Sequence, residues 1–180
     1  MSKDLILDTE TTGLLKPNVV DLDKQPKIIE LGIIVVEDGK ITGRHNWLIN
    51  PDEEITPEIT KITGIKNEDL IGKPLFREIL AQVEQVFSGA DRMICHNAPF
   101  DQGMLEVELK RCGRTGFPMP PEVICTVQEY KHLFGGKWPK MTLLYEKIVG
   151  KPLEQTHRAS DDCEALCEIL TTDGFFELKI

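Results

Sequence analysis

Residues 5–14 read LILDTETTGL, an apolar run that gives way at once to two acids two positions apart. We predict a short buried strand over 4–8. Side chains two apart on a strand point to the same face, so Asp8 and Glu10 would project together at its end. Neighbouring carboxylates disfavour each other's ionisation, and acids are rarely buried unpaired. A cation between them would resolve both problems. The alternative is that the strand has ended and both acids are solvated.

The stretch after this first strand predicts a hairpin. Residues 28–37 (IIELGIIVVE) read as a second strand, and DGK at 38–40 signals a tight turn. A third strand over 41–49 would then pair with the second. Residues 51–65 read as a loop with a short helix.

The rest of the chain alternates strands with helices. Asn97 would cap a helix that carries Pro99 in its first turn and runs to about Arg111. The other expected elements are a helix over 75–88, strands over 92–97 and 122–126, and helices near 127–134, 140–149 and 159–171. An antiparallel start followed by strand–helix alternation predicts an α/β fold, a mixed sheet of five strands with flanking helices.

Size and composition indicate an ordinary globular protein. The 180 residues predict a single domain over 1–180, with 41% hydrophobic and 28% charged residues. The sequence has no apolar run near the roughly 20 residues of a membrane span, so no membrane partner is expected. The N-terminal segment lacks the shape of a signal peptide. We therefore expect a cytoplasmic location.

Five cysteines without a Cys-x-x-Cys pair favour reduced, mostly buried thiols. Cys163 and Cys167 are four apart and could share a helix face. Packing in the core is the better interpretation than metal binding, because no third soft ligand lies nearby in the sequence.

The net charge of −9 argues against a protein that wraps long stretches of nucleic acid. Such binding depends on Lys and Arg side chains that neutralise phosphates. The charge does not exclude an enzyme that holds one chain end through metal ions.

Two further stretches carry acids in suggestive places. Asp101 lies in HNAPFDQGML (96–105), and Asp162 follows His157 by five residues in THRASDDCEAL (156–166). An acid in the first turn of a helix is also favoured by the helix dipole, and His157 could be a capping residue. Each stretch alone is therefore ambiguous.

Taken together, Asp8, Glu10, Asp101, Asp162 and His157 form a chemical set. Oxygen-donor acids suit Mg²⁺ or Mn²⁺. Two divalent ions about 4 Å apart can activate water and stabilise a leaving oxygen. A histidine with a pKa of about 6.5 could take the proton from that water at neutral pH. The set predicts phosphodiester hydrolysis.

Three stretches resemble the motifs of the DEDD 3′–5′ exonucleases, in the same order and over nearly the whole chain: DTETTGL (8–14), HNAPFDQGML (96–105) and HRASDD (157–162). The histidine five residues before the last acid resembles the DEDDh branch, which includes polymerase III epsilon proofreading subunits. The resemblance implies a ribonuclease H-like fold and two Mg²⁺ or Mn²⁺ ions. It also implies stepwise release of nucleoside monophosphates from the 3′ end of DNA, with RNA left open.

Carried over by position, the resemblance makes His157 the general base and assigns the metal ligands Asp8, Glu10, Asp101 and Asp162. It implies that Thr11, Thr12 and Leu14 contact the terminal nucleotide. Glu58 and Thr63 are the matching candidates in the segment 57–65, although relatives often carry histidine in place of Thr63. Cys125-Thr126 replaces the more usual Asp-Thr, a change we expect to be structural.

Several roles stay open. The expected partner is single-stranded nucleic acid or a frayed 3′ end, with a polymerase or another protein as a tether. The alternatives are a non-catalytic binding or scaffolding module, a proofreading subunit, and a phosphodiesterase of small nucleotides. GFFELKI (174–180) could be a docking strand, although an edge strand on the domain's own core is the better interpretation.

Overall fold

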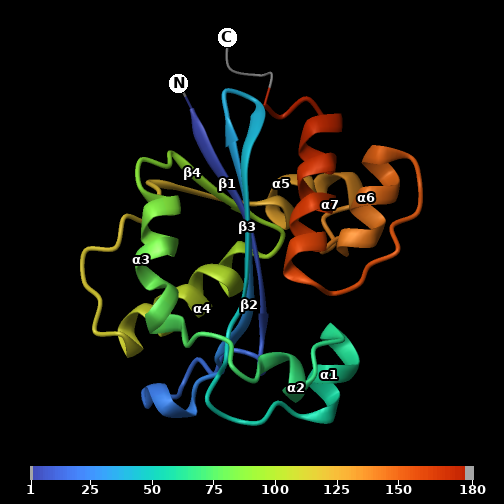
Figure 1. Ribbon diagram of the computed structural model, residues 1–180. Helices are drawn as coiled ribbons and strands as arrows, with labels where there is room; N and C mark the ends of the chain where they lie inside the picture. The colour runs from blue at the N-terminus through green and yellow to red at the C-terminus, as the bar shows by residue number, and fades with distance from the viewer. Residues whose placement is uncertain (1, 177–180) are drawn as a thin grey trace.

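The computed structural model describes residues 2–176 and contains a five-stranded mixed sheet in the order β3-β2-β1-β4-β5 (Figure 1). β1 pairs antiparallel with β2 and parallel with β4, β2 pairs antiparallel with β3, and β4 pairs parallel with β5. The predicted α/β, ribonuclease H-like sheet is confirmed. The strands are β1 (Lys3–Thr11), β2 (Ile28–Glu37), β3 (Lys40–Leu48), β4 (Arg92–Cys95) and β5 (Glu122–Cys125).

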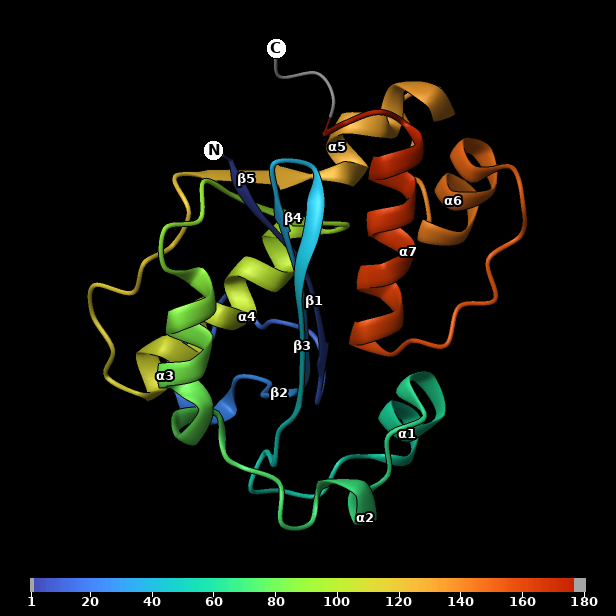
Figure 2. The ribbon, with the colours of Figure 1, turned by 45° about the horizontal axis from the view of Figure 1, so that its top comes forward.

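Helices cover both faces of the sheet. α3 and α4 lie on one face, and α5, α6 and α7 lie on the other (Figures 1 and 2). The helices are α1 (Pro57–Thr63), α2 (Asn67–Leu70), α3 (Phe76–Phe87), α4 (Ala98–Arg111), α5 (Thr126–Tyr130), α6 (Met141–Val149) and α7 (Ala159–Thr172), with 3₁₀ turns η1 (Leu22–Lys24) and η2 (Lys131–Phe134). In the part of the chain that is described, no helix is long and apolar enough to cross a membrane.

Alternation along β1 separates two hydrophobic cores. Leu5 and Leu7 point toward α3 and α4, whereas Ile6 points toward α6 and α7. Cys163 and Cys167 are buried in the second core, which confirms their predicted packing role.

β1 is longer than predicted, and this changes the setting of the acids. The strand continues to Thr11, so Asp8 and Glu10 lie inside it and face Gly32 and Glu30 of β2. Neither acid is fully exposed. The prediction ended the strand where the apolar run ended, but backbone pairing with β2 sets its length. The interpretation of Asp8 and Glu10 as solvated loop acids is therefore wrong.

Two smaller predictions are also corrected. Asn97 precedes α4, but its side chain makes no capping hydrogen bond. Residues 174–176 form part of a turn rather than a strand, and the Phe175 ring lies 5.0 Å from the guanidinium carbon of Arg92. The remainder of the predicted strand, 177–180, lies outside the described residues.

A glycine lets α7 rest directly on the sheet. A Cβ atom at Gly32 would lie 2.6 Å from the backbone oxygen of Ala159 and 2.7 Å from its carbonyl carbon. Both atoms belong to the first residue of α7, so a side chain at position 32 would push the start of the helix outward.

We predict that Gly32→Ala destabilises the fold by about 1–3 kcal/mol, because overpacking against backbone atoms forces a shift. Denaturant unfolding measures the loss. The matched control is Gly43→Ala on β3, where the nearest atom is the movable His45 side chain at 3.1 Å. Equal effects of the two substitutions would show that the contact with α7 is not tight.

Candidate active site

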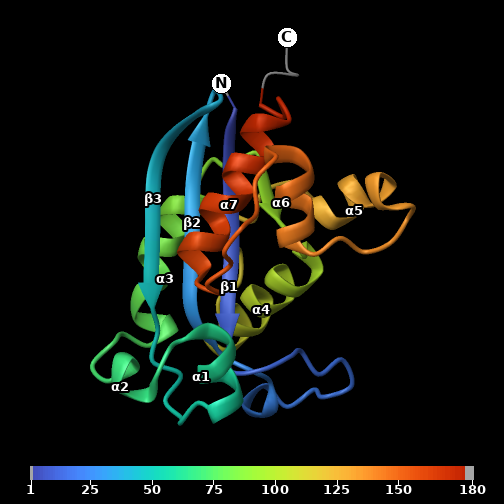
Figure 3. The same cartoon turned by 90° about the vertical axis from the view of Figure 1, so that its right-hand side faces the viewer.

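Three elements bring the four predicted acids to one end of the sheet. β1 supplies Asp8 and Glu10, the first turn of α4 supplies Asp101, and the first turn of α7 supplies Asp162. β1 and β4 are parallel neighbours, so the helix that follows β4 begins beside the carboxyl end of β1. Figure 3 shows the starts of α4 and α7 on either side of that end.

Asp101 is held by β1 itself. The backbone N–H and the hydroxyl of Thr9 donate to one Asp101 carboxylate oxygen, at 3.1 and 2.8 Å. Asp101 is only 3% exposed. A role limited to the helix dipole would not require this burial. Thr9 was not predicted as a site residue, although its place between Asp8 and Glu10 could have suggested a supporting role.

Asp162 is held from the loop before α7. The Gln155 side-chain amide donates to both carboxylate oxygens of Asp162, at 3.1 and 3.0 Å. His157 is exposed and adopts a left-handed backbone conformation with φ of 52°. One donor atom from each of Glu10, His157 and Asp162 lies within 4.8 Å of the other two. The structure thus brings the predicted histidine to two of the four predicted acids, Glu10 and Asp162.

The acids are crowded enough to resist ionisation. Burial, reinforced by the charges of Asp101 and Asp162, holds the pKa of Asp8 well above its usual range. Burial and the charge of Asp162 raise the pKa of Glu10 from 4.5 to about 8. These shifts are the physical signature of like charges gathered away from water.

The other two acids show the same crowding, partly relieved by hydrogen bonds. Burial raises the pKa of Asp101 from 3.8 to about 7, against the lowering effect of the Thr9 hydrogen bonds. Burial also raises the pKa of Asp162, against the lowering effects of Gln155 and His157. Four crowded carboxylates beside one imidazole form a donor set that fits hard divalent cations.

A buried acid on β2, missed in the sequence, anchors the start of α7. Glu30 is fully buried and faces Glu10 across the β1–β2 pair. Its carboxylate accepts two hydrogen bonds from the Arg158 guanidinium at 2.8 Å and one from the Ala159 backbone N–H at 3.1 Å. Asn46 of β3 donates a fourth at 2.8 Å. The available signal was an acid in the interior of the apolar strand IIELGIIVVE, whose other acid, Glu37, is its last residue.

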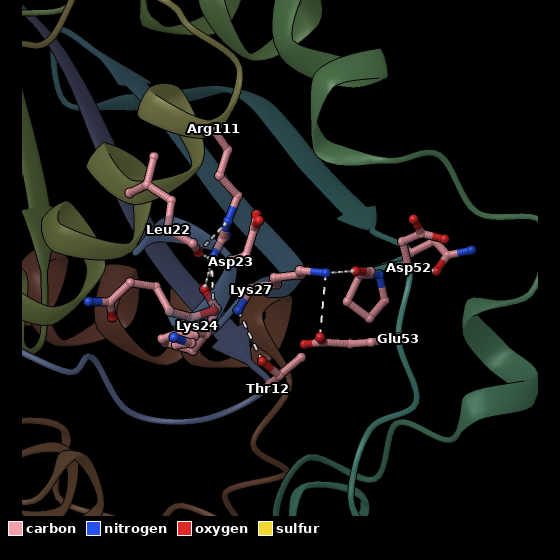
Figure 4. A network of polar contacts seen from close by, with 12 residues as sticks. Thr12, Leu22, Asp23, Lys24, Lys27, Asp52, Glu53 and Arg111 are labelled. Atoms are coloured by element: carbon pink, nitrogen blue, oxygen red, sulfur yellow. Dashed lines mark hydrogen bonds and ion pairs between the residues drawn. The ribbon is translucent and has the colours of Figure 1, made fainter. Parts of the chain in front are cut away.

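The turn after β1 is held by its own backbone and by Lys27. The Thr11 hydroxyl donates to the Gly13 carbonyl at 2.8 Å, and the Thr12 hydroxyl accepts from the Lys27 N–H at 3.0 Å (Figure 4). Leu14 is 78% exposed. The two threonine side chains therefore shape the turn, and Leu14 remains free for contact.

Arg111 fastens the loop that continues from this turn. Its guanidinium donates to the backbone carbonyls of Leu22, Gln25 and Pro26, at 2.7–3.1 Å (Figure 4). Glu108 accepts from the same guanidinium at 2.8 Å and also from the Ile28 N–H at 3.1 Å. The far end of α4 thus supports the loop that leads away from β1.

The two predicted nucleotide-contact residues on α1, Glu58 and Thr63, differ in exposure. Glu58 is exposed in the first turn of α1. Thr63 is only 2% exposed, and its hydroxyl donates to the Ile59 carbonyl and accepts from the Ile65 N–H. The structure therefore gives the Thr63 side chain a role in ending α1, and we do not assign it a nucleotide contact.

Comparison with known proteins identifies the family. A family model described as Exonuclease matches residues 5–170. The DNA polymerase III epsilon subunit of Treponema pallidum is 32% identical over 167 residues, which are 92% of this chain and 73% of that protein. The chain belongs to the exonuclease family. As a member of this family, the protein is a nuclease and therefore a hydrolase.

Other relatives are much longer. The PolC-type DNA polymerase III of Clostridium perfringens is 32% identical over 92% of this exonuclease, which spans 11% of that protein. The 3′-5′ exonuclease DinG of Bacillus subtilis is 35% identical over 89% of the chain, which spans 16% of it.

Solved structures share the fold. The nuclease domain of 3′hExo, described as a DEDDh family member bound to rAMP, superposes with a TM-score of 0.77 at 14% identity, over 98% of this exonuclease and 93% of that chain. Exonuclease X, in complex with 5′ overhanging duplex DNA, superposes with a TM-score of 0.64 at 27% identity. The match covers 95% of this chain and 93% of that one.

We predict that the metal-free exonuclease loses stability as the pH rises from 6 to 8. Glu10 and Asp101 have raised pKa values in the folded state, so the folded protein binds more protons than the unfolded chain in this range. The stability that the two protonated acids contribute is fully present below the pKa values that they have in the unfolded chain. It is lost as the pH rises through the raised pKa values of the folded state. Thermal unfolding in chelator, at pH 6 and pH 8, measures the effect.

Glu10→Gln removes one titrating group and should flatten this pH dependence. Mn²⁺ should raise the unfolding temperature more at pH 8 than at pH 6, because carboxylate ligands must be deprotonated to bind it. A metal-free unfolding temperature that rises from pH 6 to pH 8 would contradict the crowding of the acids.

Proposed function

We propose that this exonuclease works in the 3′–5′ direction with two divalent ions, Mg²⁺ or Mn²⁺, and releases nucleoside monophosphates from the 3′ end of DNA, with RNA as a second candidate substrate. The observation that carries the proposal is the convergence of four crowded acids and His157 at the carboxyl end of β1. Crowded carboxylates with raised pKa values are stabilised by bound cations, and such sites cluster where function requires them.

In the proposed mechanism, Asp8, Glu10, Asp101 and Asp162 would hold the ions. Bound divalent ions supply positive charge against the charge that develops on the phosphate, and they make water more acidic. Thr9 and Gln155 keep Asp101 and Asp162 in place, because each donates two hydrogen bonds to its carboxylate.

His157 is proposed to take the proton from the attacking water. It is exposed, so its ring can reach water, and it lies within 4.8 Å of carboxylates from Glu10 and Asp162. Its left-handed backbone conformation turns the chain just before α7 begins. Leu14, exposed on the turn after β1, is proposed to contact the terminal nucleotide together with Thr11, Thr12 and Glu58.

The substrate proposal draws on two fold neighbours. One is described as bound to rAMP and the other as a complex with 5′ overhanging duplex DNA. Relatives named as DNA polymerase III epsilon subunits support a polymerase as a tethering partner. We also propose a cytoplasmic location, in keeping with DNA-processing relatives. The non-catalytic alternative is weaker, because all four acids and the histidine are present.

Digestion of a 5′-labelled single-stranded DNA with Mg²⁺ or Mn²⁺ tests the proposal. We expect a ladder of shortened products, release of nucleoside monophosphates, and no digestion in chelator. Asp8→Asn should reduce turnover by at least about 10³-fold, because it removes a charged ligand at the centre of the acid cluster. Identical digestion by the wild type and Asp8→Asn would refute the assignment, and matched RNA oligonucleotides would rank the two substrate classes.

We predict that His157→Ala lowers kcat by about 10²–10⁴-fold, the usual contribution of a general base, with little change in KM. His45→Ala is the matched control, because His45 is a half-buried histidine on β3 whose ring stacks on Trp47, away from the acids. A His157→Ala enzyme with a kcat close to that of the wild type would exclude the general-base role.

A further inference from the structure

One surface segment is basic, although the chain as a whole is acidic. Residues 131–140 (KHLFGGKWPK) connect α5 to α6 and contain three lysines, one histidine and no acid, in a chain with a net charge of −9. The segment comprises η2 and the loop that follows it, and none of the predicted catalytic or substrate residues lies in it. We refer to it as the 131–140 segment.

Trp138 gives this segment an exposed aromatic surface. Its side chain is 59% exposed, and among residues 2–176 it is the only aromatic one in the set of large exposed hydrophobic side chains. Lys137 and Lys140, which flank it closely, are also exposed. An aromatic ring beside cationic side chains is the combination that binds single-stranded nucleic acid, through stacking on bases and attraction to phosphates.

His96 ties the segment to the edge of the sheet that bears the active site. Its Nε2 lies 3.1 Å from the Pro139 carbonyl, and its Nδ1 lies 3.0 Å from the Thr126 hydroxyl. A carbonyl can only accept, so Nε2 carries the hydrogen and Nδ1 accepts from Thr126. Burial lowers the pKa of His96, which agrees with this neutral form. Pro139 is itself buried, so the segment is firmly attached.

The attachment point lies next to the catalytic elements. His96 directly follows β4 and precedes α4, whose first turn carries Asp101. β4 is the parallel neighbour of β1, so their carboxyl ends share one edge of the sheet. In Figure 3 the loop between α5 and α6 returns to the body of the protein beside the start of α4.

We propose that the 131–140 segment binds the single strand of nucleic acid upstream of the nucleotide that is hydrolysed, with Trp138 stacked on a base and Lys137 and Lys140 near phosphates. This inference rests on the proposed exonuclease function and adds a second contact region for the same substrate. It reconciles the acidic net charge with nucleic-acid binding, because a local basic surface suffices to hold a few nucleotides next to the site.

Steady-state kinetics with a single-stranded 20-mer test the lysines. For Lys137→Ala/Lys140→Ala we expect KM to rise about tenfold at low salt, with kcat within twofold of the wild type. Because each lost phosphate contact removes about 0.7 from the slope of log affinity against log salt, the slope should fall by about 1.4. The matched control is Lys40→Ala/Lys110→Ala, two exposed lysines on β3 and at the end of α4. It removes the same charge outside the segment.

Fluorescence tests the stacking independently of turnover. The chain has two tryptophans, so Trp47→Phe leaves Trp138 as the single tryptophan reporter. In the inactive background Asp8→Asn, titration with an oligothymidylate should quench Trp138 emission. In the kinetic assay Trp138→Ala should raise KM about tenfold, and Trp138→Phe, which retains an aromatic face, should recover most of the loss.

The outcomes separate the two proposals. If the wild type digests neither oligonucleotides nor dinucleotides with Mg²⁺ or Mn²⁺, the exonuclease function itself fails. If it digests them but the segment variants change the 20-mer KM no more than the control does, the segment does not bind the strand. Oligonucleotide binding without quenching of Trp138 would also overturn the inference, and would leave the segment as a surface for a protein partner.

Discussion

The contact between the first turn of α7 and strand β2 is the constraint on which the candidate active site depends. Gly32 lets the backbone of Ala159 approach the sheet, and the buried Glu30 carboxylate binds both Arg158 and the Ala159 N–H. Asp162 lies three positions further along, in the same first turn. The position of this acid relative to Glu10 is therefore set by a steric requirement at Gly32 and by the Glu30–Arg158 ion pair.

The second feature that shapes the site is the unfavourable free energy of holding four carboxylates close together and away from water. Each of Asp8, Glu10, Asp101 and Asp162 has a raised pKa, with burial as the leading cause in every case. Thr9 and Gln155 orient two of them through neutral donors, which position an acid without cancelling its charge. The four acids therefore remain a donor set of the kind that suits divalent cations, and the two hydrophobic cores on either side of β1 supply the stability that offsets the repulsion.

Two regions of the surface are held by residues at or next to the two ends of α4. Arg111 and Glu108 at the end of α4 secure the loop that follows β1, whereas His96, two residues before α4, contacts the 131–140 segment. The region of α4 thus connects the acid cluster to two surface regions. Cys125 and Thr126 lie beside His96 as well: the Cys125 thiol donates to the His96 carbonyl at 3.5 Å, and the Thr126 hydroxyl contacts the His96 ring.

The sequence by itself determined the sheet, the order of its elements and the five candidate catalytic residues, because strand alternation, helix spacing and short motifs are local signals. It did not determine how far β1 extends, since polar residues 8–11 stay in the strand only through pairing with β2. Nor did it reveal Glu30, whose partner Arg158 is 128 positions away, or Thr9, which holds Asp101 across 92. The burial of Thr63 was equally out of reach, since only the packed fold places its hydroxyl at the end of α1. The local sequence shows which side chains have suitable chemistry. Burial and long-range hydrogen bonds, which depend on the tertiary structure, decide which side chains hold the site together.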